Sequence, residues 1–113
     1  IRERFIDTLG HKIDELDLMM TRIEVRQDAD IALLAAVQSM HRIVGVASTL
    51  GFPELGRSAR NAEASLVRAT GNLHDKRIVT EAIESVEKTV SVMDGIWTAA
   101  RGWCAIESVS VRG

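Results

Sequence analysis

Residues 33–55 read LLAAVQSMHRIVGVASTLGFPEL, and the pattern of this stretch decides the fold class. Apolar side chains recur along it every three or four residues, at Leu33, Ala36, Met40, Ile43, Ala47 and Leu50. This is the spacing of one face of an α-helix. Gly51 then predicts the end of that helix, and Pro53 suits the first turn of the next one. The stretch therefore predicts two helices joined by a tight reversal.

Three further segments show the same periodicity. Their apolar positions are Ile6, Leu9, Ile13, Leu16, Met20 and Ile23; Phe52, Leu55, Ala59, Ala62, Leu66 and Ala69; and Val79, Ala82, Val86, Val90, Met93, Trp97 and Ala100. Asp28 or Asp30, and later Asp75, are suited to cap the helices that follow them. Four long helices with short connections predict an all-α protein, an antiparallel up-down-up-down four-helix bundle. In the tail from Gly102 to Gly113, Trp103 and Ile106 either continue the fourth helix or fold back on the bundle.

The composition restricts the class of protein. With 113 residues, of which 46% are hydrophobic, the chain is expected to be one domain over residues 1–113 with a real core. The net charge of −2 and the lack of a basic tract exclude a nucleic-acid partner. No apolar run approaches the roughly 20 residues that cross a bilayer, so no membrane partner is expected. Cys104 is the one cysteine, which leaves no internal disulfide and favours a cytoplasmic location.

His41 stands in mid-helix with Gly45 one turn later. A mid-helix glycine costs about 1 kcal/mol against alanine, so we expect Gly45 to keep space open beside the imidazole. At about 100° per residue, His41 points roughly 130° away from the centre of the apolar stripe, on the outer flank. Beside it on the same side of the helix lie Leu34, Val37, Gln38, Val44 and Ser48. Apolar residues there predict either a partner-docking surface or a wide core stripe.

These residues resemble the histidine phosphotransfer (HPt) family, including the phosphoacceptor domain of chemotaxis-type histidine kinases. The family's motif is a histidine, any residue, Leu or Ile, usually Lys, then Gly, small residues, a Leu or Phe, and Gly. Here it runs from His41 through Ile43 and Gly45 to Leu50 and Gly51. The following Phe52-Pro53-Glu54-Leu55 and Ala59-Arg60-Asn61-Ala62-Glu63 are similar to the family's third helix.

The resemblance implies that His41 accepts a phosphoryl group from a histidine kinase, a hybrid sensor kinase or a phosphorylated receiver domain. It then passes the group to an aspartate of a response regulator in a two-component phosphorelay. Such domains are not independent enzymes. The receiver supplies the acidic pocket and Mg²⁺, so no metal and no cofactor is expected in this chain. We expect a monomer, either free-standing or part of a longer kinase.

The resemblance also implies supporting residues. Glu63 is the candidate to hydrogen-bond His41 and orient the ring, and the alternative is a solvated surface glutamate. Val44 departs from the family, which usually carries Lys there, beside the phosphoryl oxygens. Arg42, Arg57 or Arg60 could supply a cation instead; Arg60 is preferred because it precedes Glu63 by three residues on the same helix face. His11 and His74 are expected to be surface or loop residues.

A competing hypothesis comes from a different class. The chain could be a helical protein-interaction module whose histidine is never phosphorylated, and the missing lysine is compatible with it. A dimeric kinase domain with its own phosphorylated histidine fits less well. In such domains an acidic residue usually follows the histidine, whereas His41 is followed by Arg42.

Overall fold

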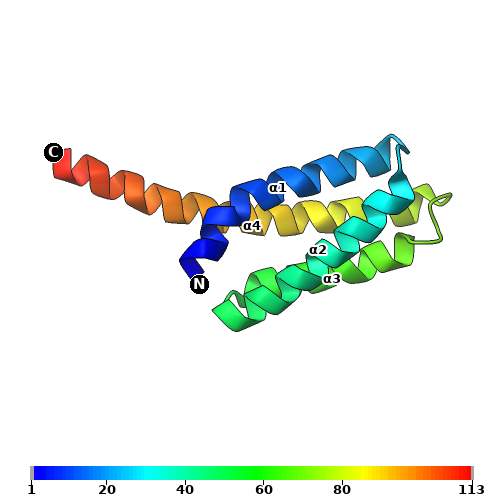
Figure 1. The fold of residues 1–113 in the computed structure, drawn as a ribbon, viewed down its shortest axis with the longest axis horizontal. Coiled ribbons are helices and arrows are strands. Elements are labelled where there is room, and N and C mark those ends of the chain that lie inside the picture. Colours follow the sequence, from blue (N-terminus) through cyan, green and yellow to red (C-terminus); the bar gives the residue numbers. More distant parts are fainter. Residues whose placement is uncertain (1, 113) are drawn as a thin grey trace.

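The computed structural model describes the backbone of residues 2–112 and the side chains of residues 3–100. Its elements, in chain order, are the helices α1 (Arg2–Glu24), α2 (Ala29–Leu50), α3 (Pro53–Ala69) and α4 (Lys76–Arg112). Successive helices run in opposite directions (Figure 1). Each packs against two neighbours, in the cyclic order α1, α2, α3, α4. The predicted all-α four-helix bundle is confirmed.

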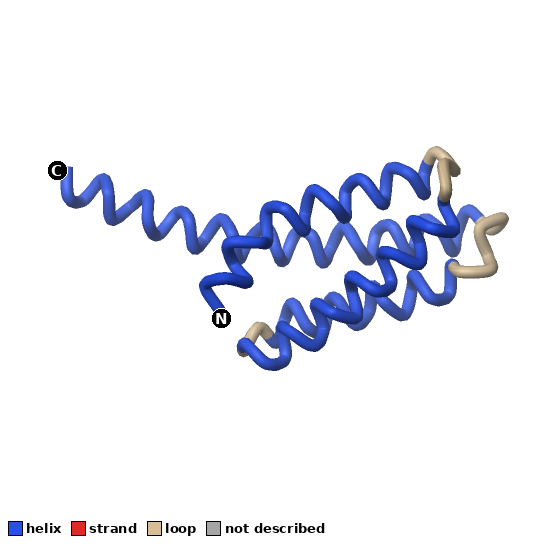
Figure 2. Tube along the Cα trace, in the orientation of Figure 1, coloured by secondary structure: helices blue, strands red, loops and turns tan. Residues whose placement is uncertain are grey.

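Two of the three connections follow the predicted turn chemistry (Figure 2). Gly51 ends α2 with a φ of 80°, in the left-handed region that glycine adopts without strain, and Pro53 opens α3. Asp75 precedes α4 and its Oδ1 accepts hydrogen bonds from the backbone N–H groups of Arg77 and Ile78, at 3.0 and 3.4 Å. The reversal at Gly51 matters most for function because it brings α3 back alongside α2.

The connection before α2 differs from the prediction. Asp28 occupies the position that precedes the helix, but its side chain makes no capping hydrogen bond. Its backbone is left-handed, with a φ of 51°, whereas a capping residue normally has an extended backbone. Asp30 lies inside the first turn of α2. The position of the helix start was therefore predicted correctly, and the side-chain cap was wrong.

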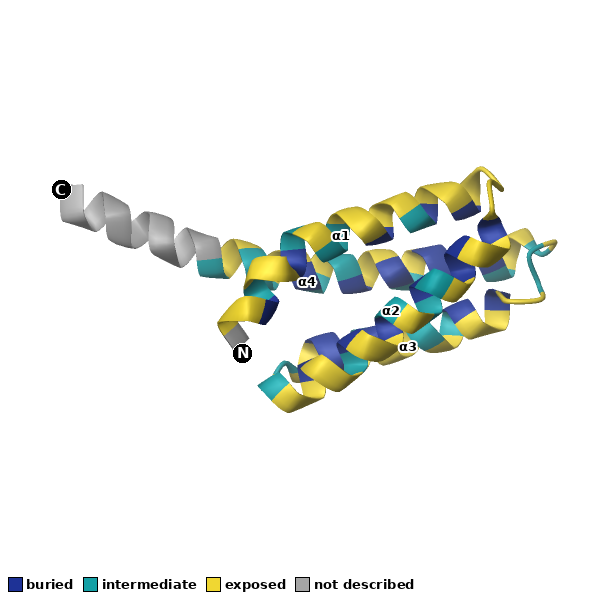
Figure 3. Ribbon diagram, viewed as in Figure 1, coloured by how far each residue is buried: buried dark blue, intermediate teal, exposed yellow. Residues whose placement is uncertain are grey.

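The core follows the predicted apolar stripes. The largest fully buried apolar side chains come from all four helices: Leu9, Leu16, Ile23, Leu33, Met40, Ile43, Leu55, Leu66, Val86 and Met93. Buried and exposed positions alternate along each helix at the helical spacing (Figure 3). Trp97, predicted as core, is half-buried and packs against that cluster. A Cβ placed on Gly10 would lie 3.5 Å from the Trp97 ring, an ordinary van der Waals contact, so α1 passes beside the indole at this point.

α4 continues to Arg112 and projects beyond the bundle (Figure 1). Of the two alternatives for the tail, continuation of the fourth helix is the one observed. The side chains of Trp103, Cys104 and Ile106 lie outside the described residues.

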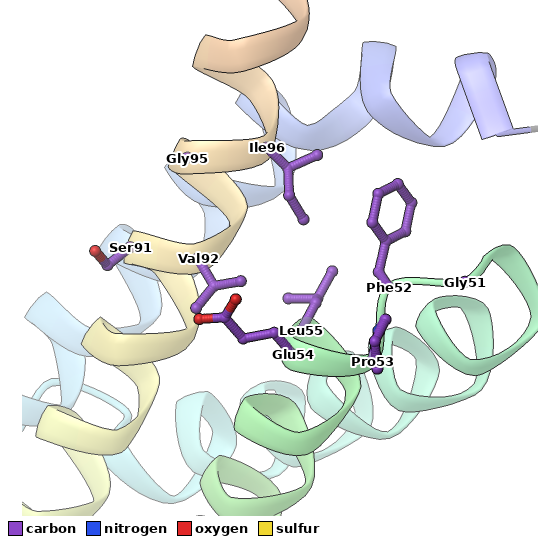
Figure 4. Close-up of a pocket in the computed structure, with 9 residues that line it drawn as sticks. All are labelled: Gly51, Phe52, Pro53, Glu54, Leu55, Ser91, Val92, Gly95 and Ile96. Carbon is purple, nitrogen blue, oxygen red and sulfur yellow. The ribbon is translucent and has the colours of Figure 1, made fainter.

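An open, largely apolar cavity of about 530 Å³ lies at the same end of the bundle, between the start of α3 and α4 (Figure 4). Its apolar lining includes Phe52, Leu55, Val92 and Ile96.

α2 is more apolar than the sequence prediction allowed. Among the described residues it is the one helix long and apolar enough to cross a membrane by length and composition, with a mean hydropathy of 1.4. The sequence prediction counted uninterrupted apolar runs, whereas this average also includes Gln38, His41 and Arg42. Core helices of soluble proteins pass the same test, and Leu33, Met40 and Ile43 of α2 are buried in the bundle. What remains to be explained is the apolar outer face of this helix.

Candidate functional site

His41 lies near the middle of α2 and points away from the core. Its side chain is 77% exposed, whereas Met40 and Ile43 on the opposite flank are buried. This is the placement that the helical periodicity predicted. The imidazole is therefore available to another protein without any opening of the bundle.

Glu63 on α3 meets His41 across the two antiparallel helices. Nδ1 of His41 and Oε2 of Glu63 are 3.0 Å apart. The side chain of Glu63 is only 25% exposed, so this is not a freely solvated surface glutamate. A carboxylate can only accept hydrogen bonds, so Nδ1 carries the proton and donates the hydrogen bond to Glu63. In the neutral ring, Nε2 then holds the lone pair at the outer end of the imidazole.

Gly45 leaves the space beside His41 empty. A Cβ built on Gly45 would meet no atom within 4 Å, and the residue is exposed. Packing inside this domain therefore does not require a glycine at position 45. The glycine also makes the helix less stable than an alanine would. The open space lies on the exposed side of α2, one turn after His41.

The predicted docking residues divide into two groups. Leu34, Gln38 and Ser48 are exposed, with Leu34 at 56%. Val37 and Val44 are half-buried and pack against the core, so the wide-stripe interpretation applies to these two in part. The structure therefore keeps Leu34 as an outward apolar group and places both valines at the edge of the core.

Sequence reasoning missed two apolar residues on this surface. Val67 of α3 is 54% exposed and follows Glu63 by one turn, which places it at the level of Val37 across the antiparallel pair. Ile31 of α2 is 64% exposed and lies one turn before Leu34. The helical spacing of Ile31 and Leu34 could have identified Ile31 from the sequence. Val67 depends on how α3 is rotated against α2, which no local pattern reveals.

On the other side of His41, toward Gly51, a groove of about 260 Å³ runs between α2 and α3. Its lining includes Val44 and Ser48 from α2 and Gly56, Arg57 and Arg60 from α3. The helices approach closely here, since a Cβ on Gly56 would lie 3.6 Å from the Cβ of Ala47. Arg57 and Arg60 are exposed, and neither forms an ion pair with a described carboxylate. Arg42 does not line the groove.

The other two histidines lie elsewhere. His11 of α1 is exposed and pairs through Nε2 with Glu15 of the same helix, at 2.6 Å. His74 is exposed in the connection before α4. Within the described residues, no three His, Cys, Asp or Glu side chains gather in a way that could hold a metal ion. His41 is thus the one described histidine that is held by a carboxylate on a different helix.

Comparison with known proteins identifies the family of the chain. The family model of the Hpt domain matches residues 1–94, which include His41, Glu63 and the first three helices. No curated protein and no solved structure gives a match. Hpt domains are phosphocarriers of two-component phosphorelays and act with kinases and receiver domains. Since the match covers most of the chain, the protein belongs to the Hpt domain family.

Proposed function

We propose that His41 is the phosphoacceptor of this Hpt domain. It takes a phosphoryl group from a histidine kinase or from the aspartyl phosphate of a receiver domain, and passes it to a response-regulator aspartate. The observation that carries the proposal is the hydrogen bond between His41 and Glu63. It holds Nδ1 of His41 3.0 Å from Oε2 of Glu63 and leaves Nε2 of the exposed ring free.

The chemistry follows from the tautomer. The lone pair on Nε2 attacks phosphorus, an N–P bond forms, and the P–O bond to the donor aspartate breaks, which releases a carboxylate. The ring keeps its proton on Nδ1 and gains positive charge. The carboxylate of Glu63 stabilises that charge and keeps the ring in one orientation. Transfer to the response regulator is the reverse of these steps.

The surface around His41 is the proposed docking site for the receiver domain. Leu34, Val37 and Val67 supply apolar contacts on one side of the ring, and Gly45 provides a clear approach. Gln38, Val44 and Ser48 complete the surface. The receiver domain supplies the acidic pocket and Mg²⁺, and this chain acts as a cytoplasmic monomer without a cofactor of its own.

The test is a phosphotransfer assay against a panel of phosphorylated receiver domains and kinase domains. We expect acid-labile, base-stable label on the wild-type protein and none on His41→Gln. His11→Gln is the matched control, because His11 is equally exposed on α1 and should be dispensable. Label that persists in His41→Gln would contradict the proposal. Binding of receivers without any label would favour the non-phosphorylated interaction module.

A further inference from the structure

We infer that Arg60 binds the phosphoryl group carried on Nε2 of His41. The Hpt family usually places a lysine three residues after its histidine, and this chain has Val44 there. Arg60 supplies the missing positive charge from the neighbouring helix. The inference rests on the proposed function, since it names the group that holds the phosphoryl oxygens at the same site.

The register of α2 against α3 places Arg60 at the level of Val44. The two helices are antiparallel, and the His41–Glu63 hydrogen bond fixes one pair of facing positions. Val44 follows His41 by three residues on α2, and Arg60 precedes Glu63 by three residues on α3. Because the helices are antiparallel, Val44 and Arg60 are displaced from the His41–Glu63 pair by the same distance and in the same direction. The contact between Gly56 and Ala47 fixes the register again further along. A cation on Arg60 therefore stands across the groove from the position of the absent lysine.

The groove has the shape and charge that an anionic group requires. Val44 and Arg60 face it from opposite helices, and Ser48 adds a hydroxyl on the same wall. Gly45 follows His41 by one turn, toward the groove, and a Cβ placed on it would meet no atom within 4 Å. Arg60 forms no ion pair with a described carboxylate and is free to turn toward an arriving phosphoryl group. A guanidinium offers a fork of N–H donors that matches phosphate oxygens.

Arg60 is favoured over the other two arginines by position. Arg57 lines the same groove but lies three residues nearer Pro53, about 4.5 Å further along α3 from the level of His41. Arg42 is outside the groove. This difference makes Arg57 a matched control, because it is also an arginine, also lies on α3 and is also exposed.

The experiment uses potassium phosphoramidate as the phosphoryl donor, so that no unidentified partner is needed. Its P–N bond breaks, ammonia leaves, and an N–P bond forms at histidine. The labelling rate of His41 is measured by peptide mass spectrometry, with His11 of the same molecule as the internal reference. The variants are Arg60→Ala, Arg60→Lys, Arg57→Ala and the double variant Arg60→Ala with Val44→Lys.

We expect Arg60→Ala to slow labelling of His41 about tenfold, because it removes a cation from the developing phosphoryl charge. Arg60→Lys should retain most of the rate, and Arg57→Ala should change it less than twofold. Val44→Lys should restore the rate in the Arg60→Ala background, a rescue that a structural role for Arg60 would not produce. An unchanged rate in Arg60→Ala, an equal loss in Arg57→Ala or no rescue by Val44→Lys would each overturn the inference. A wild-type protein labelled on His11 but not on His41 would instead overturn the proposed function, and this inference with it.

Discussion

His41 and Glu63 join two helices through one ring nitrogen, with Nδ1 of His41 3.0 Å from Oε2 of Glu63. His11 and Glu15 form the opposite arrangement, through Nε2 and within one helix. The pair with Glu63 leaves Nε2 of His41 free, whereas the pair with Glu15 leaves Nδ1 of His11 free. Two exposed histidines in one small domain thus present different nitrogens to solvent.

Removal of the Glu63 carboxylate should slow phosphoryl transfer. Glu63→Ala takes away the acceptor that selects the Nδ1–H tautomer and the charge that stabilises the phosphorylated ring, and we predict a loss of about tenfold or more. Glu63→Gln keeps an acceptor oxygen but no charge, and should lose less. The rate is measured by single-turnover transfer from a phosphorylated receiver. Glu15→Ala is the control on α1 and should transfer at the wild-type rate; an equal loss there would argue against a specific role for Glu63.

Gly45→Ala should stabilise the fold and impair transfer. The new methyl group meets no atom within 4 Å, so the gain in helix propensity, about 1 kcal/mol, should raise Tm by roughly 4 °C. The same methyl lies on the surface where we propose that the receiver docks, so transfer should slow.

Gly95→Ala is the matched control for this prediction. Gly95 is also within a helix, is also exposed and would also meet nothing within 4 Å, but it lies on α4 beside the apolar cavity of Figure 4. We expect a similar rise in Tm with no change in transfer. If Gly45→Ala transferred as fast as the wild type, the open space beside His41 would have no function in docking.

Apolar residues on both helices of the site should contribute to receiver binding. Leu34→Asp and Val67→Asp place charge on the proposed docking surface, and we predict that each raises the Kd for a receiver domain about tenfold, by isothermal titration calorimetry. Labelling by phosphoramidate should be unchanged, since Leu34 lies two turns from His41 along α2 and Val67 lies one turn from Glu63 along α3. Leu18→Asp on α1 is the control, because Leu18 and Val67 are both 54% exposed. Equal weakening by Leu18→Asp would place the receiver on a different face.

A buried hydroxyl pair should contribute to the stability of the bundle without affecting the site. Thr89 of α4 is fully buried, and its Oγ1 lies 2.9 Å from the Oγ of Ser58 on α3 and 3.1 Å from the backbone oxygen of Ser85. Thr89→Val removes both hydrogen bonds and should lower the free energy of unfolding by about 1–2 kcal/mol in urea titrations. Phosphorylation of His41 should proceed normally at a temperature where the variant is folded. A variant as stable as the wild type would show that this pair is energetically neutral.

The sequence predicted most of this fold because helix formation and burial are periodic along the chain. The stripe from Leu33 to Leu50 identifies the buried face of α2, and the reversal at Gly51 and Pro53 brings Glu63 back beside His41. The same local logic failed at Asp28, where the left-handed backbone turns the side chain away from the role of a cap.

Features that depend on two helices at once were harder to predict. Val67 joins the surface around His41 through the rotation of α3 against α2, and Gly10 lies beside Trp97, which is distant in sequence. The preference for Arg60 came from its spacing to Glu63 on one helix. Its position across from Val44 needs the register of both helices, which the His41–Glu63 contact supplies.

The central claim is that Nε2 of His41 carries the phosphoryl group, and it is tested most directly by NMR of the phosphorylated protein. The protein is labelled with ¹⁵N in histidine, phosphorylated by its receiver, and the phosphorus is assigned to a ring nitrogen through its coupling to ¹⁵N. We predict a single phosphorylated residue, His41, with the phosphoryl group on Nε2 and the proton retained on Nδ1. Phosphorylation on Nδ1 of His41, or on His11 or His74 in its place, would contradict the account.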